Sequence, residues 1–214
     1  FFPFNGNTAD IGPDKMGVTV VGNDVKFTSA DRESVAGNAA GFDGSGGLLV
    51  ASNNVLNLGL NDFSVSCWVK TDKTNRMMIW QESGKNGSGD NQSWLRYGDN
   101  TTDRRMRFNT EQSGGGTIVN MGAPADNLPD VMNNQWHHVV CVRAGLKMLV
   151  YVDGVEIKTA TTPSIRNVTG DQDFKIAFQE GLTSFSNFFT GEIDDFIIYK
   201  KALNLTEVRE LFNL

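Results

Sequence analysis

The chain has 214 residues, of which 39% are hydrophobic and 21% are charged, and its formal net charge is −6. This length and composition suit one ordinary globular domain. Phosphate binding needs concentrated positive charge, so the acidic balance argues against nucleic acid as a partner. No run of 18 apolar residues occurs, and we therefore expect no membrane insertion.

Alternation of apolar and polar residues with a period of two runs through most of the chain and predicts short β-strands. In the segment FSVSCWVK (63–70), every second residue from Phe63 to Val69 is apolar, and Trp68 lies on the opposite face with two serines. Further strands are expected at 77–81, 94–98, 105–109, 117–121, 136–143, 173–179 and 192–200, each bounded by Gly, Asn, Asp or Ser.

Two local patterns predict a hairpin and a helix near the C-terminal end. The segment 147–160 predicts a hairpin, because Asp153-Gly154 supplies the positive φ angles of a two-residue turn. Asn204 is a suitable N-cap, and Glu207 stands three residues later. This is the pattern of a capping box, and it predicts one short helix that reaches Phe212.

The spacing of the strands predicts the fold class. Short strands at regular intervals, with turn signals and no interleaved helices, indicate a sandwich or a jelly roll. We predict an all-β fold, a two-sheet antiparallel jelly-roll sandwich with one short C-terminal helix. No repeat or low-complexity linker divides residues 1–214, so one domain is expected. The chain starts at Phe1 without an initiator Met, and we expect a domain excised from a larger protein with flanking domains.

The few Cys and His residues favour structural roles. Cys67 and Cys141 lie inside apolar strands, which favours buried free thiols, with a disulfide bridge as the alternative. His137 and His138 are the only histidines. Adjacent strand residues point to opposite faces, so the two rings are poorly placed to share one metal ion.

A carboxylate in the last predicted strand requires a partner. Alternation along GEIDDFIIY (191–199) places Asp194 on one face with Phe196 and Ile198, the side expected to look inward. A carboxylate there is costly unless a cation or several hydrogen bonds satisfy it. A metal ion would meet that need, and so would N–H donors from the N-terminal turn.

Several segments, in this order, resemble the laminin-G-like, or concanavalin A-like, jelly-roll family of bacterial lectin and adhesin domains. They are FFPFNGNTAD (1–10), GFDGSGGLLV (41–50), DFSVSCWVK (62–70), WHHVVCV (136–142), LVYVDGVEI (149–157) and GEIDDFIIYKKALNLTEV (191–208). No single motif is specific, but the ordered set covers nearly the whole chain. The resemblance implies two antiparallel sheets stacked face to face, with the N- and C-terminal strands side by side.

The resemblance also implies a structural calcium ion on the convex side, bracing the termini. The closing strand of the family reads roughly hydrophobic-Asp-x-hydrophobic-x-hydrophobic-Tyr, and IDDFIIY (193–199) matches it. Its Asp, here Asp194, would be a calcium ligand. Backbone oxygens near Asn5 and near Asp43-Gly44 would complete the site, with Asp10 as a further carboxylate. Calcium takes six to eight such oxygens.

The same strand raises the question of catalysis. Glu192, Asp194 and Ile197 occupy the three positions of the E-x-D-x-x-E strand of laminarinase-type glycoside hydrolases. Retaining enzymes need two carboxyl groups about 5 Å apart, and Ile197 cannot transfer a proton. In the related glucanases the catalytic strand lies earlier in the chain, and residues 60–180 contain no such triplet. We expect no enzyme, and a hydrolase or lyase with displaced acids is the less favoured alternative.

A sugar site combines an aromatic ring with planar hydrogen-bonding groups, and the segment 80–100 offers both around the polar loop SGKNGSGDNQS (83–93). The candidate residues are Trp80, Trp94, Arg96, Tyr97 and Asp99. Trp94 and Arg96 share a strand face and are the preferred pair, with Trp80 as the nearest further ring. The alternative is that both tryptophans are core residues beside a hairpin tip.

Three functions are compatible with these features. The leading hypothesis is a non-catalytic, lectin-like carbohydrate-binding module of a bacterial cell-surface or secreted protein, with a glycan or polysaccharide as partner. The second is a protein-interaction or spacer domain of an adhesin without a sugar site. An apolar loop at 185–189 is then a candidate contact surface. The third is the enzyme considered above. Fold alone does not choose among them, because one sandwich hosts many functions.

Overall fold

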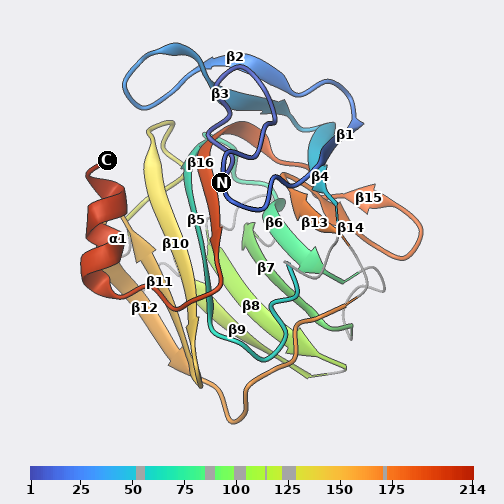
Figure 1. The fold of residues 1–214 in the computed structure, drawn as a ribbon, viewed down its shortest axis with the longest axis vertical. Coiled ribbons are helices and arrows are strands. Elements are labelled where there is room, and N and C mark those ends of the chain that lie inside the picture. Colours follow the sequence, from blue (N-terminus) through green and yellow to red (C-terminus); the bar gives the residue numbers. More distant parts are fainter. Residues whose placement is uncertain (52–55, 85–89, 99–104, 114, 122–128, 171–172) are drawn as a thin grey trace.

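The structure is a computed structural model, and it describes residues 1–51, 56–84, 90–98, 105–113, 115–121, 129–170 and 173–214. Two large β-sheets make up most of this part of the chain, and a helix lies outside them (Figure 1). The predicted all-β, two-sheet antiparallel jelly-roll sandwich with a short C-terminal helix is confirmed.

The first sheet has seven strands in the order β1-β4-β13-β6-β7-β8-β9. They are β1 (Val18–Gly22), β4 (Gly46–Val50), β6 (Met77–Ser83), β7 (Gln92–Tyr97), β8 (Met106–Gln112), β9 (Gly115–Met121) and β13 (Phe174–Ile176). Each neighbouring pair is antiparallel. Strands β6 to β9 form a meander, and β13 joins it to β4.

The second sheet also has seven strands, in the order β12-β11-β10-β5-β16-β3-β2. They are β2 (Lys26–Ala30), β3 (Ala36–Asp43), β5 (Phe63–Lys70), β10 (His137–Ala144), β11 (Lys147–Val152), β12 (Val155–Thr161) and β16 (Thr190–Tyr199). A separate two-stranded hairpin is formed by β14 (Gln179–Glu180) and β15 (Phe185–Ser186). The C-terminal strand β16 lies inside the second sheet, between β5 and β3.

Alternate residues of both sheets fill the core between them. On β5, the inward set from Phe63 to Val69 is at most 1% exposed, and on β7 Leu95 and Tyr97 join the same core. Cys67 belongs to this set, and both cysteines are buried free thiols, as expected. Burial of this apolar surface is the main favourable contribution to folding.

Four strands in the first 50 residues were not predicted. β1 and β2 are edge strands, and their residues are mostly exposed or half-buried, which weakens the apolar alternation. β3 reads AGNAAGFD and carries few large apolar side chains. Pairing with neighbouring strands, rather than local sequence, fixes these segments as β-structure.

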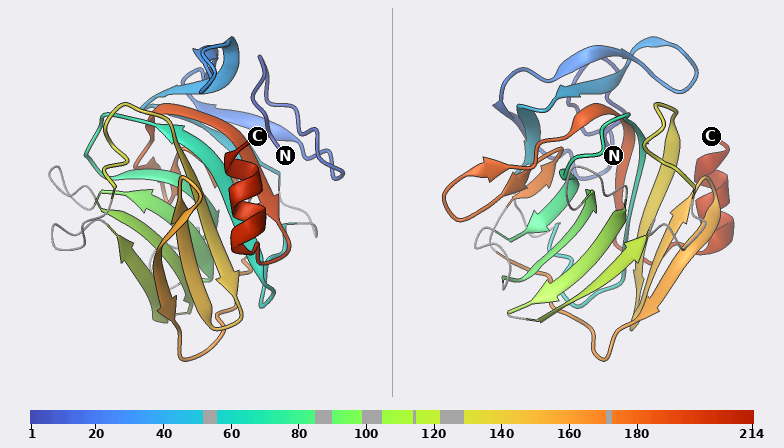
Figure 2. Two further views of the ribbon diagram at one scale, coloured as in Figure 1. Left: turned by 90° about the vertical axis from the view of Figure 1, so that its left-hand side faces the viewer. Right: turned by 180° about the vertical axis from the view of Figure 1, so that it is seen from behind.

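The predicted hairpin and helix are both present. Asp153 and Gly154 have φ angles of 50° and 74° and connect β11 to β12. Helix α1 (Leu205–Phe212) starts at the Asn204 capping box. It lies on the outer side of the second sheet (Figure 2), where Val208 packs with Val140 of β10 and Tyr151 of β11. Within the described ranges, no helix is long and apolar enough to cross a membrane.

A β-bulge in β16 changes the face on which Asp194 lies. Pairing of β16 with β5 shifts register between Asp194 and Ile197, and Asp195 has a φ of 44°. Phe196 is in the core, whereas Asp194 lies opposite Trp68, which points outward. The expectation that Asp194 shares the inward face with Phe196 is wrong, because the bulge adds a residue to this strand.

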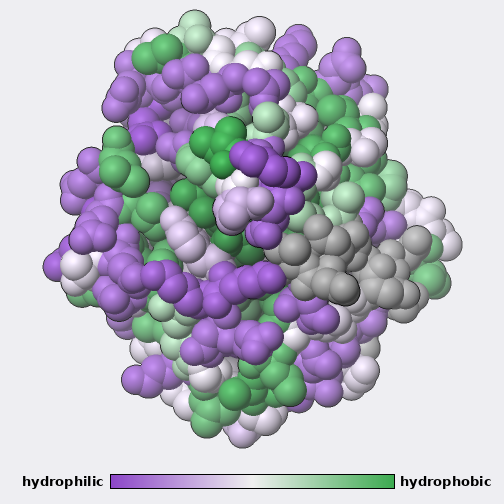
Figure 3. Space-filling model, in the orientation of Figure 1, coloured by the Kyte–Doolittle hydropathy of each residue, from purple (hydrophilic) through white to green (hydrophobic). Residues whose placement is uncertain are grey.

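The N-terminal segment lies beside the C-terminal strand β16, as the resemblance implies, and pairs with it at Phe196. The backbone N–H of Phe2 donates to the Phe196 oxygen at 2.8 Å, and the Phe196 N–H donates to the Phe2 oxygen at 2.9 Å. Hydrophobic residues reach the surface between this segment and α1 (Figure 3). The two ends of the described chain therefore border the same side of the second sheet.

Replacing Trp80 by Ala tests the placement of this ring in the core. Trp80 is fully buried and stacks on Phe174, with ring centroids 5.7 Å apart. The free energy of unfolding should fall by about 3–5 kcal/mol, because a large cavity replaces the indole. Urea denaturation measures the loss. Trp136→Ala, at a half-buried position, should cost less than about 1 kcal/mol, and equal losses would contradict the placement.

Candidate functional site

The residues expected to bind sugar are separated by face. Trp94 and Arg96 lie on the outer face of the first sheet, as predicted, with the Arg96 guanidinium carbon 4.7 Å from the Trp94 ring centroid. Trp80 and Tyr97 point into the core and are 0% exposed, so the expectation that they contact a sugar is corrected. These large rings gain more by burial between the sheets than by exposure. Asp99 lies outside the described residues.

Buried polar side chains surround Trp94 on the outer face of the first sheet. Lys175, Gln81, Trp94 and Asn109 form one row across β13, β6, β7 and β8, and none is more than 7% exposed. The Gln81 amide donates to Gln92 at 3.1 Å. Trp94 is therefore not the open stacking platform that the sequence suggested.

The Asp43-Gly44 turn, whose backbone oxygens were expected to join Asp194 in a calcium site, lies away from that carboxylate. Asp43 lies opposite Thr190, four residues before Asp194 on β16, which corresponds to about 13 Å along a strand. Its carboxylate accepts the backbone N–H of Ser45 at 2.9 Å. Gly44, with a φ of 89°, belongs to the same β3–β4 turn.

The oxygen atoms of the N-terminal segment that were expected to bind calcium accept hydrogen bonds instead. The backbone oxygen of Asn5 accepts the Asn7 amide at 3.0 Å. The Asp10 carboxylate accepts the backbone N–H groups of Gly12 and Met16, both at 2.8 Å. Among the described residues, no three His, Cys, Asp or Glu side chains are grouped as a metal site would require. The residues present do not fit the calcium site that the resemblance implies.

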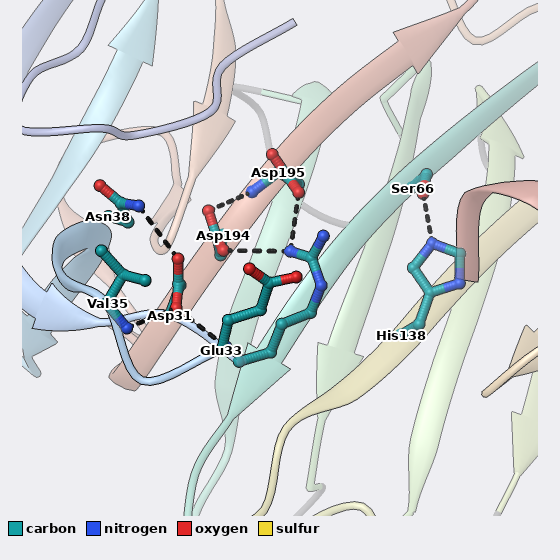
Figure 4. A network of polar contacts seen from close by, with 9 residues as sticks. Asp31, Glu33, Val35, Asn38, Ser66, His138, Asp194 and Asp195 are labelled. Carbon is teal, nitrogen blue, oxygen red and sulfur yellow. Dashed lines mark hydrogen bonds and ion pairs between the residues drawn. The ribbon is translucent and has the colours of Figure 1, made fainter. Parts of the chain in front are cut away.

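Asp194 has a different partner, Arg32. The Arg32 Nη1 lies 3.4 Å from the Asp194 carboxylate and 2.8 Å from that of Asp195 (Figure 4). Burial, and then the charge of Asp195, raise the pKa of Asp194 to about 7, while the Asp195 N–H and Arg32 oppose that rise. The guanidinium carbon of Arg32 also lies 4.8 Å from the Trp68 ring centroid.

An open groove lies beside this cluster. It has a volume of about 620 Å³, and we call it the Trp136 groove. Its lining combines aromatic rings, amides and charged groups, namely Arg32, Glu33, Trp68, Gln135, Trp136, Asp153, Phe212, Asn213 and Leu214. Sequence reasoning missed this groove, because its residues come from the β2–β3 turn, β5, the segment before β10, the β11–β12 turn and the C-terminal helix region, which only the fold brings together.

Neighbouring residues hold one carboxylate and two aromatic rings of the groove in position. The Asp153 carboxylate accepts the His138 backbone N–H at 2.9 Å and lies 2.8 Å from His137 Nδ1. The Trp68 ring stacks on Phe212 with centroids 5.6 Å apart, and the Lys70 Nζ lies 5.8 Å from the Trp136 ring centroid. Asp153, Trp68 and Trp136 are therefore held by contacts with neighbouring residues.

A second hollow, of about 660 Å³, lies between the N-terminal segment and α1 and is mostly apolar. Within it, Ser66 Oγ lies 2.8 Å from His138 Nε2 (Figure 4). In the described part of the chain, His138 Nδ1 has no hydrogen-bond partner, so the carboxylate that orients the histidine of a nucleophilic triad is not at this atom. Glu192, from the triplet-like strand, forms an ion pair with Lys70 at 3.1 Å.

Comparison with known proteins identifies the family. A family model described as the concanavalin A-like lectin/glucanases superfamily matches residues 42–209. This is more than half of the chain, so the protein belongs to that superfamily. Paraclostridial mosquitocidal protein 1 of Paraclostridium bifermentans is 26% identical over 180 residues, which cover 78% of this chain and 13% of that protein.

Solved structures that are similar to this chain include binding domains of clostridial toxins. The binding domain of Paraclostridial mosquitocidal protein 1 has a TM-score of 0.75 at 16% identity, covering 97% of this chain and 49% of that one. A structure of botulinum neurotoxin type C, described as dependent on two ganglioside molecules for cell entry, has a TM-score of 0.72 at 16% identity, with 99% and 49% covered. The binding domain of botulinum neurotoxin DC in complex with rat synaptotagmin II has 0.73 at 17%, with 99% and 50% covered. The chain spans about half the length of these structures.

The buried His138 should make stability fall in mild acid. Burial lowers the pKa of its imidazole from 6.5 to about 4. At pH 5 the unfolded chain therefore binds a proton that the folded protein does not, and stability is lost as pH falls through the unfolded pKa. The loss that His138 alone causes between pH 7 and pH 5 should be about 2 kcal/mol, and Asp194, with its pKa raised to about 7, acts in the opposite direction.

Urea unfolding at the two pH values, compared between the wild type and His138→Gln, isolates this contribution, since other titrating groups act alike in both proteins. His137→Gln serves as the control for loss of an imidazole. An unchanged pH dependence in His138→Gln would contradict the assignment.

Proposed function

We propose that this chain is a non-catalytic carbohydrate-binding module of a larger secreted or cell-surface bacterial protein. The sugar is held in the Trp136 groove, on the side of the second sheet opposite the core. Gln135, Asp153 and the free edge of Arg32 provide hydrogen bonds to hydroxyl groups, and the Trp136 ring packs on the C–H face of a pyranose.

The observation that carries this proposal is the composition of an accessible groove. Trp136 is half-buried and Gln135 is exposed, whereas Trp94 keeps only 7% of its surface. A ring that still contacts water gains apolar burial when a sugar covers it, at about 25 cal/mol per Å². The structural neighbour that interacts with gangliosides, which are glycolipids, supports a sugar as the ligand class.

An array of sialylated, galactose-containing and glucan oligosaccharides, probed with the isolated domain, tests the function. Binding should be weak, as expected for a small wet interface. For an oligosaccharide that binds, Trp136→Ala should raise Kd at least about tenfold, equivalent to about 1.4 kcal/mol. Isothermal titration calorimetry measures Kd, and melting curves show that the variant remains folded.

Phe185→Ala is the matched control, because it removes an exposed ring that does not line the groove, and its Kd should equal that of the wild type. If Arg96→Ala abolished binding while Trp136→Ala did not, the site would lie on the Trp94 face and the groove would be excluded. If the domain bound none of the oligosaccharides on the array, the sugar-binding function would be contradicted.

A protein-interaction domain is the second candidate, and the β14–β15 hairpin favours it. Leu182 and Phe185 are 66% and 44% exposed, and residues 181–191 carry no charge. The Phe185 ring packs edge to face against the Phe178 ring, with centroids 5.1 Å apart. The structural neighbour in complex with rat synaptotagmin II shows that this fold occurs in a protein that binds a protein partner.

A further inference from the structure

We propose that the Arg32 guanidinium is the built-in cation of this sandwich and takes the place that the family resemblance gives to calcium. Its anionic partners are Asp194 and Asp195 on the bulge of β16. The inference concerns how the fold is held and is independent of whether the groove binds sugar.

The need for a cation follows from the burial of the aspartate pair. Asp194 is 2% exposed, and the adjacent Asp195 carries a second carboxylate on the same bulge. The only other hydrogen bond described for the Asp194 carboxylate is from the backbone N–H of Asp195, at 2.7 Å. Two neighbouring carboxylates in a partly dry site repel each other unless a positive group offsets their charge.

Arg32 meets both carboxylates with one nitrogen. Its Nη1 lies 2.8 Å from Asp195 and 3.4 Å from Asp194, and the side chain of Arg32 is 18% exposed. The guanidinium plane also rests on Trp68. A guanidinium is planar and weakly hydrated, so it can pair with a carboxylate and stack on a ring at the same time.

The turn that carries Arg32 is held by hydrogen bonds of its own. The Asp31 carboxylate accepts the backbone N–H groups of Glu33 and Val35, both at 2.9 Å, and the Asn38 amide at 3.1 Å (Figure 4). Burial would raise the pKa of Asp31, but these hydrogen bonds outweigh it and lower that pKa. Asp31 is thereby engaged within its own turn, and this turn delivers one cation to β16.

A calcium ion would need a different arrangement. It would require six to eight oxygens at about 2.3–2.6 Å, but the guanidinium already contacts the two carboxylates of the bulge. Asp10 and Asp43 accept backbone N–H groups of their own turns. A covalently attached cation also carries no dependence on the concentration of a free ion.

Melting curves of the protein, after washing with EGTA and with or without millimolar calcium, provide the test. The wild-type Tm should differ by less than about 1 °C between the two conditions, because bound calcium would raise it by several degrees. Arg32→Ala should lower Tm by about 5–10 °C, because it leaves a buried carboxylate without its partner. Arg32→Lys keeps the charge but not the planar contact, and its loss should be intermediate.

Two further variants make the result specific. Glu33→Gln, on the same turn, is the matched control and should leave Tm unchanged. Arg32→Ala combined with Asp195→Asn should lose less than the sum of the single variants, because the two side chains interact. Calcium-dependent melting of the wild type, additive losses, or an Arg32→Ala Tm equal to that of the wild type would each overturn the proposal. If Arg32→Ala does not fold, Arg32→Lys and Asp195→Asn carry the same comparison.

Discussion

The inward face of each sheet has to be apolar, and this requirement decides which aromatic side chains remain for function. The chain has four tryptophans. Trp80 falls on the inward face and is part of the core, and Trp94 falls on the outer face but is almost covered. Trp68, at 8% exposure, is as covered as Trp94, but together with the half-buried Trp136 it lines an open groove. The candidate site follows from what the core does not use.

The outer face of the second sheet carries charges that the core could not. Asp194 is turned outward by the bulge in β16 and pairs with Arg32. The same guanidinium lies on Trp68, which in turn stacks on Phe212 of α1. These contacts connect the β2–β3 turn with β16, with β5 and with helix α1. Arg32, Trp68 and Phe212 thus form one wall of the Trp136 groove.

The relation to toxin binding domains concerns the fold. Identities of 16–17% with TM-scores of 0.72–0.75 show the same arrangement of sheets. One jelly-roll scaffold can present different grooves and loops to different partners. The chemistry of this chain's own groove, with its rings, amides and acids, is therefore the basis of the proposed ligand class.

Elements with local signals could be predicted from the amino-acid sequence. Alternation on β5 and β7, the positive φ angles at Asp153-Gly154 and the Asn204 capping box each depend on a few neighbouring residues, and each was predicted. The edge strands β1 and β2 were missed, because long-range pairing makes them strands. Tertiary structure alone decided that Asp194 faces Arg32, 162 residues away in the chain, and that Trp68 meets Trp136 in one groove. Local sequence reports which residues can form a strand, but a bulge and the packing of distant segments determine what each side chain touches.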